Sequence, residues 1–67
     1  MFSGYYDDCG RRLNEWDLVE AVCQDGVVLG EICEVEDKMW CIMPKEKGMP
    51  CPQVWECSSI IRLGKAD

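Results

Sequence analysis

The sequence predicts a single small all-β domain, built as a sandwich or a barrel. Its 67 residues leave room for one hydrophobic core, because a chain of this length forms one domain. Between Trp16 and Leu63, short apolar segments alternate with turn-forming residues, at the spacing of about 8–12 residues that is typical of small all-β folds. Closure of the sheet would also protect the edges that so small a sheet otherwise exposes.

Residues 1–14 are expected to form an irregular N-terminal arm in front of a folded domain over residues 15–64. Gly4, Gly10 and Asn14 are turn formers, and neither the strand period nor the helix period develops around them. The arm is therefore predicted to contain no regular element.

The first strand is expected over residues 16–23, with Val19, Ala21 and Cys23 on one face. A helix that runs from this segment into the next one is disfavoured, because Gly26 and Gly30 would each cost about 1 kcal/mol in its interior. The Gln24-Asp25-Gly26 segment predicts a tight turn, since Asp-Gly is a strong hairpin signal.

The second strand is expected to be long, over residues 27–36. Its apolar side chains at Val27, Leu29, Cys33 and Val35 share one phase, which is the phase expected to face the core. Gly30 lies inside this segment, where glycine indicates a bulge or a sharp bend.

The remaining segments are shorter and are separated by turns and by one loop that contains all three prolines. Pro44 ends an apolar strand, because proline cannot continue a strand or helix interior. The sequence predicts a turn at 37–38, a strand at 39–43, a loop at 44–52, a strand at 53–57, one helical turn at 58–60 and a last strand at 61–63.

The order of these segments resembles the SH3-like barrel group, which includes Tudor and KOW domains. The resemblance rests on D-L-V-E-A-V, the Q-D-G turn, the long G-V-V-L-G-E-I-C-E-V segment, M-W-C-I-M, V-W-E-C and I-R-L. It implies a five-stranded barrel over about residues 15–63, in which the long second strand bends and serves both halves. A weaker resemblance, in Ile61-Arg62-Leu63-Gly64, is to small bacterial YdfZ-like proteins described as selenium-binding.

The acidic side chains are concentrated in the first half of the chain. The net charge is −6; residues 1–37 carry ten acidic and two basic side chains, whereas residues 38–67 carry three acidic and five basic ones. Because Lys and Arg supply the affinity for a phosphate backbone, direct nucleic-acid binding is not expected. An acidic patch would instead steer a basic protein partner, and a merely solvated surface is the alternative interpretation.

The six cysteines contain no C-x-x-C pair, and there is no histidine. Structural zinc sites draw two ligands from one tight turn, so no metal and no cofactor are expected. Cysteines within strands are expected to pack as small hydrophobic side chains, and those near loops are the candidates for reactivity. The first group is Cys23, Cys33 and Cys41; the second is Cys9, Cys51 and Cys57.

Catalysis finds little support in the residue types. Ser58 and Ser59 have no histidine to act as a base. Glu34 and Glu36 would lie roughly 7 Å apart on one strand face, but paired carboxylates hydrolyse glycosides only inside a substrate cleft, for which the chain is too short. The protein is therefore expected not to be an enzyme.

The N-terminal residues lack the basic and apolar segments of a signal peptide. The longest apolar run, 39–43, is far shorter than a membrane span. A cytoplasmic location with reduced thiols, and no membrane partner, is therefore expected.

Together these features predict a non-catalytic protein-binding module, an acidic adaptor or inhibitor that docks on a basic partner surface, as small phage and mobile-element proteins do. The contact residues are expected to be Glu20, Glu31, Glu34, Glu36, Asp37, Trp40 and Trp55. One alternative is a thiol-based metal- or selenium-binding protein. Another is a structural subunit that forms a homodimer through an exposed strand face.

Overall fold

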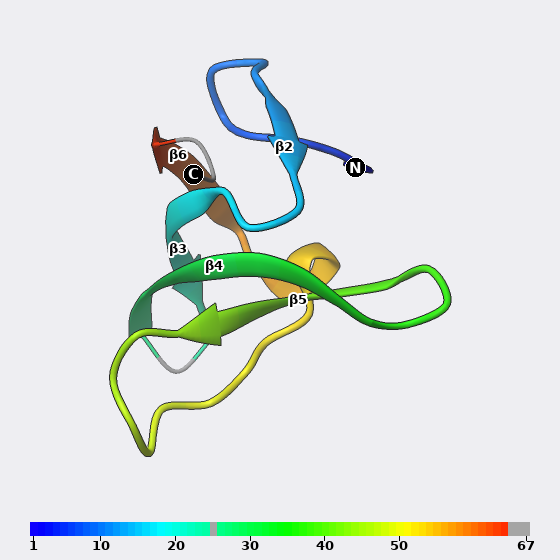
Figure 1. Cartoon of the computed structure of the whole chain (residues 1–67). Helices are drawn as coiled ribbons and strands as arrows, with labels where there is room; N and C mark the ends of the chain where they lie inside the picture. The colour runs from blue at the N-terminus through cyan, green and yellow to red at the C-terminus, as the bar shows by residue number, and fades with distance from the viewer. Residues whose placement is uncertain (25, 65–67) are drawn as a thin grey trace.

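The protein is all-β, as the sequence predicts (Figure 1). The computed structural model describes residues 1–24 and 26–64. Within these ranges, a two-stranded sheet packs with a four-stranded sheet of order β5-β4-β3-β6, and every strand pair is antiparallel. The elements are β1 (Phe2–Tyr6), β2 (Arg12–Asn14), β3 (Leu18–Cys23), β4 (Gly26–Glu36), β5 (Met39–Pro44), the 3-10 turn η1 (Val54–Glu56) and β6 (Ser59–Gly64).

The larger sheet is open, with β5 and β6 at its two edges. It therefore has four strands in the described part of the chain, where five strands closed into a barrel were expected. Asp25, in the predicted hairpin turn, and residues 65–67 lie outside the described residues.

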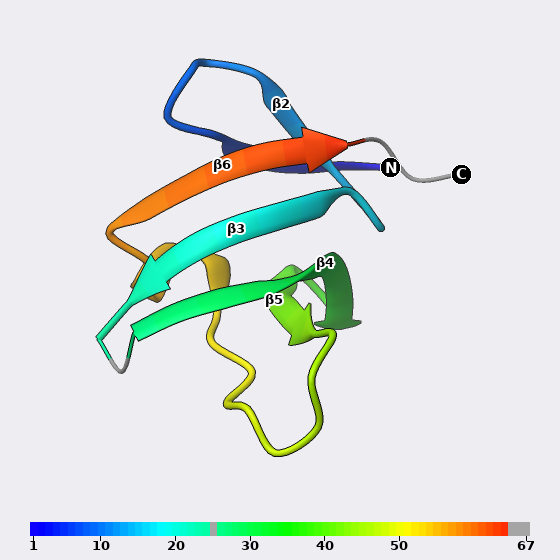
Figure 2. The same ribbon diagram turned by 90° about the vertical axis from the view of Figure 1, so that its left-hand side faces the viewer.

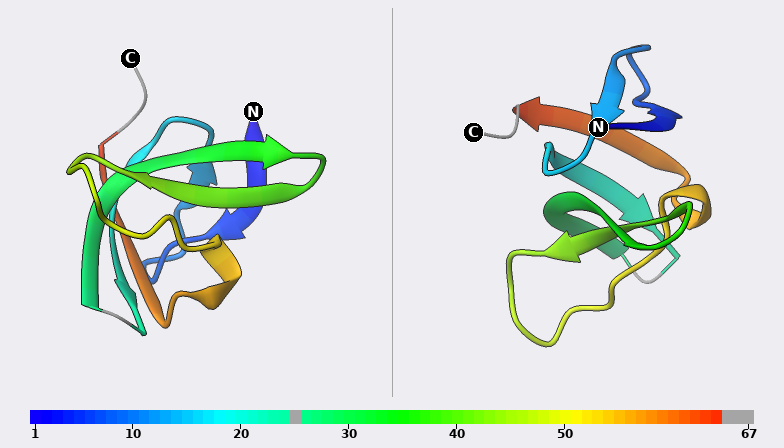
Figure 3. Two further views of the ribbon diagram at one scale, coloured as in Figure 1. Left: turned by 90° about the horizontal axis from the view of Figure 1, so that it is seen from below. Right: turned by 45° about the vertical axis from the view of Figure 1, so that its right-hand side comes forward.

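β4 is the long strand that joins the two halves of the larger sheet. Its residues up to Glu31 pair with β3, and those from Gly30 onward pair with β5. β4 curves strongly along its length (Figure 3). Gly30 lies where β4 passes from one partner to the other, and a Cβ there would stand 2.2 Å from the Met43 carbonyl oxygen. The glycine thus permits the close approach of β5.

From Val27 to Ile32 the core phase of β4 is the opposite of the predicted one, whereas Cys33, which belongs to the predicted phase, is buried as expected. Val28, Gly30 and Ile32 face inward and are buried, whereas Val27 and Leu29 are exposed. Both phases of this strand are apolar, so alternation alone does not select one. The inner phase holds Gly30 because the tight approach of β5 leaves no room for a side chain there. The core consists of Leu13, Val19, Ala21, Val28, Ile32, Trp40, Ile42, Val54 and Ile60.

Residues 1–14 form a β-hairpin, so the prediction of an irregular arm is wrong. β1 and β2 pair at Phe2 with Asn14 and at Tyr6 with Arg12. Leu13 of this hairpin is fully buried in the common core. The buried Ser3 hydroxyl donates a hydrogen bond of 2.6 Å to the Leu13 carbonyl oxygen. The hairpin lies beside β6 (Figure 2).

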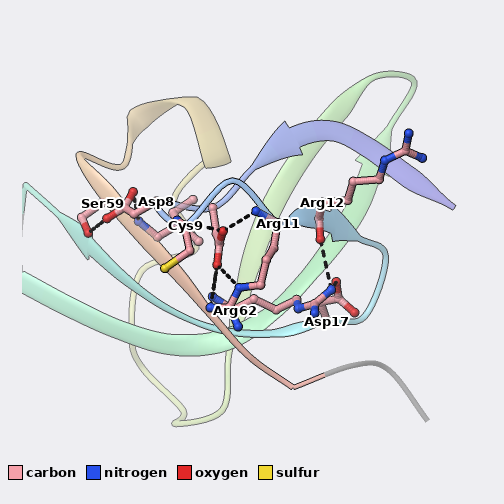
Figure 4. A network of polar contacts seen from close by, with 9 residues as sticks. Asp8, Cys9, Arg11, Arg12, Asp17, Ser59 and Arg62 are labelled. Atoms are coloured by element: carbon pink, nitrogen blue, oxygen red, sulfur yellow. Dashed lines mark hydrogen bonds and ion pairs between the residues drawn. The ribbon is translucent and has the colours of Figure 1, made fainter.

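Two aspartates at the tip of this hairpin, Asp7 and Asp8, bind the backbone of β6; Asp8 is labelled in Figure 4. The amide of Arg62 donates to Asp7 Oδ2 at 3.0 Å, and the amide of Ile60 donates to Asp8 Oδ1 at 3.3 Å. The amide of Asp8 in turn donates to the Ile60 carbonyl oxygen at 2.8 Å. These bonds satisfy backbone groups on the edge of β6 that does not face β3.

The segment around Trp55 also differs from its prediction as a strand. Residues Val54–Glu56 form η1, closed by the amide of Glu56, which donates to the Gln53 carbonyl oxygen at 2.9 Å. Glu56 Oε2 accepts a hydrogen bond of 2.8 Å from the Gln53 amide. The helical turn expected at 58–60 is absent, because β6 already begins at Ser59.

Candidate functional site

One face of the larger sheet is turned away from the core, and we call it the outer sheet face. Residues directly opposite one another in an antiparallel pair point to the same side of the sheet. Val22 pairs with Val27, and Glu20 lies between Leu29 and Ile61. By this register the outer sheet face includes Leu18, Glu20, Val22, Val27, Leu29, Glu31, Met43 and Ile61.

The outer sheet face is largely apolar. Val22, Val27, Leu29 and Met43 are between 42% and 55% exposed. Single exposed apolar side chains are common on protein surfaces, but a contiguous group of them marks a contact site. These four side chains come from three neighbouring strands, so they form one continuous surface rather than scattered positions.

Two of the predicted contact residues, Glu20 and Glu31, lie on this same face. Glu20 is exposed in the middle of β3. Glu31 is half-buried, and its Oε1 lies 3.4 Å from Lys45 Nζ. An exposed ion pair of this kind contributes little to stability. Both carboxylates therefore lie next to the exposed apolar side chains of the outer sheet face.

The other three predicted acids lie elsewhere, at the far end of the β4–β5 hairpin, which projects from the rest of the sheet (Figure 3). Glu36 and Asp37 are exposed at its turn. Glu34 Oε2 accepts a hydrogen bond of 2.9 Å from the amide of Lys38, a turn residue with a φ of 62°. Glu34 thus helps to close the turn, and the structure does not join these acids to the outer sheet face.

The two predicted tryptophans have opposite environments. Trp40 is 6% exposed and belongs to the core. It offers no contact surface, so the structure does not support the expectation that it touches a partner. Trp55 on η1 is 64% exposed, and its Nε1 donates a hydrogen bond of 2.5 Å to Gln53 Oε1.

The sequence pattern does not identify the apolar members of the outer sheet face as surface residues. It places Val27 and Leu29 in the core, because their phase is the more apolar one in β4. The signal that could have found them is Gly30, which shares its phase with Val28 and Ile32. A glycine required by a close backbone approach identifies the inner side of a bent strand.

Five cysteines lie in or against the larger sheet and its connections. Cys33 and Cys41 face one another across β4 and β5 and are buried, as predicted; burial is the main reason that the pKa of each thiol is raised. Cys23 is only half-buried, and Cys51 is exposed. Cys57 follows η1, and its Sγ lies 3.3 Å from Cys23 Sγ.

A cleft of about 240 Å³ opens beside this pair of thiols. Its walls are formed by the end of β3 and by the loop that leads to η1. The lining residues are Cys23, Gln24, Pro50, Cys51, Pro52 and Glu56. Two cysteines, Cys23 and Cys51, therefore border a space accessible to a small molecule.

Among residues 1–24 and 26–64, no group of three or more cysteine, aspartate or glutamate side chains is arranged to hold a metal ion. The same residues contain no helix long and apolar enough to cross a membrane. Comparison with protein-family models, with curated proteins and with solved structures finds no match to this chain.

Proposed function

We propose that this protein is a non-catalytic binding module that docks through its outer sheet face on a protein partner carrying basic side chains next to an apolar surface. The observation that carries the proposal is the combination of four half-exposed apolar side chains with Glu20 and Glu31 on one face. Apolar burial would supply most of the affinity. The two carboxylates would supply orientation and a faster association rate.

The charge distribution of the chain supports a basic partner. The excess of acidic side chains falls in residues 1–37, which include all of β3 and β4. A partner surface of like charge would be repelled, whereas a basic surface would be attracted over roughly a Debye length, about 8 Å at physiological salt. The proposal thus describes an acidic adaptor or an inhibitor that covers a basic site.

The direct test is site-specific cross-linking in a lysate of the native host. A photo-reactive amino acid at Leu29 should capture the partner, because Leu29 lies in the middle of the outer sheet face. The same group at Cys9, exposed in the turn between β1 and β2, is the matched control and should not. Equal capture from both positions would contradict docking through this face, and capture of a second copy from Leu29 would instead support the homodimer.

The partner identified in this way can then be titrated with purified variants. We expect Glu20→Gln to raise the Kd and to reduce its dependence on salt, because one cation of the partner loses its counter-charge. Glu36→Gln, at the projecting turn, removes the same charge from a different place and should change both quantities less. A basic partner surface would be ruled out if the Kd did not depend on salt and if both variants bound as tightly as the original protein.

A further inference from the structure

One pair of neighbouring thiols joins two distant parts of the chain. Cys23 ends β3 and Cys57 directly follows η1, 34 residues later, and their Sγ atoms lie 3.3 Å apart. The backbone next to both residues is fixed, because the amide of Ser58 donates to the Val22 carbonyl oxygen at 2.9 Å. Small side-chain rotations would therefore suffice to reach the S–S bond length of about 2.05 Å.

Access to the pair is one-sided. Cys23 lines the 240 Å³ cleft together with Cys51, whereas Cys57 does not line it. Both members of the pair pack against the core, Cys57 from the side of η1. A small molecule that enters the cleft would consequently meet Cys23 first.

We propose that Cys23 and Cys57 form an intramolecular disulfide when the protein meets a small-molecule disulfide such as oxidised glutathione. The thiolate of Cys23, having lost its proton to solvent, attacks one sulfur of the small disulfide. A Cys23–glutathione bond forms, the original S–S bond breaks, and one glutathione thiolate leaves. Cys57 then loses its proton and attacks Cys23 Sγ, which displaces the second glutathione thiolate.

The electrons and protons of the two steps balance. The two cysteines are oxidised by two electrons, and both electrons leave on the glutathione thiolates. The two released protons convert these thiolates into two molecules of reduced glutathione. No metal and no further oxidant is required.

The environment of Cys57 fits the second role rather than the first. Burial, the hydrogen bond with Cys23 and the nearby negative charge of Glu56 raise the pKa of Cys57 to about 12. Its thiol is therefore a poor first attacker. Once Cys23 is bound to glutathione, Cys23 no longer contributes to the raised pKa of Cys57. The thiol of Cys57 then faces Cys23 Sγ, which is now part of a disulfide and which Cys57 already contacts.

The other cysteines are placed differently. Cys33 and Cys41 are buried, and Cys9 lies in the turn of the N-terminal hairpin. Cys51 shares the cleft with Cys23 and competes there for the small disulfide. The proposal is independent of the docking function, since it concerns the inner side of β3 and the cleft.

The test uses the full chain and can be carried out on the purified protein alone. The folded protein is equilibrated in buffers of oxidised and reduced glutathione, its remaining thiols are blocked with N-ethylmaleimide, and the chain is cleaved after glutamate. Cleavage at glutamate leaves each of the six cysteines in its own peptide, with Cys23 in 21–31, Cys51 in 47–56 and Cys57 in 57–67. Mass spectrometry then identifies each link without ambiguity.

We expect peptide 21–31 to be linked to peptide 57–67, with the loss of two hydrogens and of two blockable thiols. In urea, where the fold no longer holds the pair together, this preference should disappear. A link between 21–31 and 47–56 would overturn the proposal. The proposal would also be overturned if N-ethylmaleimide blocked the thiols of both 21–31 and 57–67 while other cysteines were oxidised. Persistence in urea of the preference for the 21–31 to 57–67 link would overturn it as well.

Two variants test the order of the steps. Cys57→Ser should accumulate glutathione on peptide 21–31, because the thiol proposed to displace it has been removed. Cys51→Ser is the matched control and should form the 21–31 to 57–67 link at an unchanged rate. The absence of glutathione from peptide 21–31 in a Cys57→Ser variant whose near-ultraviolet circular dichroism is native would contradict the first step.

Discussion

Gly30 of β4 lies so close to Met43 of β5 that a Cβ at position 30 would stand 2.2 Å from the Met43 carbonyl oxygen and 2.8 Å from its carbonyl carbon. The atoms in the way belong to the backbone of an ordered strand. They cannot move aside as the end of a flexible side chain can. This contact explains why β4, one of the two inner strands of the larger sheet, carries a glycine near its middle.

We therefore expect Gly30→Ala to lower the free energy of unfolding by about 2–3 kcal/mol or more, as overpacking does. Gly64→Ala is the matched control, because Gly64 also lies in a strand and a Cβ there meets no atom within 4 Å. Urea unfolding followed by circular dichroism measures both variants. Equal stability of the two would show that β4 and β5 do not approach closely at Gly30.

The inward and outward phases of β4 can be distinguished with two neighbouring valines. Val28 is 2% exposed, and Val27 on the opposite face is 55% exposed. Val28→Thr should cost about 1–3 kcal/mol, because it buries a hydroxyl group in an apolar core. Val27→Thr keeps a β-branched side chain at an exposed position and should change the free energy of unfolding by less than about 0.5 kcal/mol. A larger loss of stability for Val27→Thr than for Val28→Thr would instead support the phase predicted from the sequence, in which Val27 faces the core.

The two tryptophans provide a similar comparison for the contact surface. Trp40→Ala removes a core side chain and should cost about 3–5 kcal/mol. Trp55→Ala removes a largely exposed one, with the loss of its hydrogen bond to Gln53, and should cost no more than about 1 kcal/mol. Chemical unfolding monitored by circular dichroism measures both. A small loss for Trp40→Ala would indicate that its ring is not packed in the core.

Local patterns predicted the all-β class, the long strand with Gly30 and the turn at Asp37-Lys38, because these features depend on residues adjacent in the chain. The hairpin of residues 1–14 was missed because its stabilising contacts are distant. Asp7 and Asp8 bind β6 across 52 to 55 residues. Contacts between residues so far apart in the chain leave no periodic pattern in the local sequence.

The candidate site was predicted in part for the same reason. The acidic character of Glu20 and Glu31 is visible in the sequence, but their grouping with Val22 and Leu29 requires the strand register. Hydropathy alone favours the phase of Val27 and Leu29 as the inner one, but both side chains are exposed. The Cys23–Cys57 contact likewise depends on how η1 returns to the end of β3, which the spacing of the cysteines does not reveal.

The Asp7 carboxylate predicts how the stability of the fold depends on pH. Its side chain is fully enclosed and accepts hydrogen bonds from the amides of Cys9, Arg11 and Arg62, at 3.0, 2.8 and 3.0 Å. Burial raises the pKa of this carboxyl group, but the backbone bonds of Arg62 and Arg11, with the guanidinium of Arg11, outweigh burial and lower the pKa from 3.8 to about 2. Asp7 is therefore held in its ionised form.

Because the pKa is lower in the folded state than in the unfolded chain, ionised Asp7 stabilises the fold at every pH above about 4. The stabilisation is lost as the pH falls from about 4 to 2. Its size follows from about 1.36 kcal/mol per pKa unit and is about 2 kcal/mol. Asp7→Asn should lower the free energy of unfolding at pH 7 by about this amount and should flatten its decline between pH 4 and 2. Glu36→Gln removes an equal charge from an exposed turn and should leave that decline unchanged, so urea titrations at several pH values separate the buried carboxylate from the general charge of the chain.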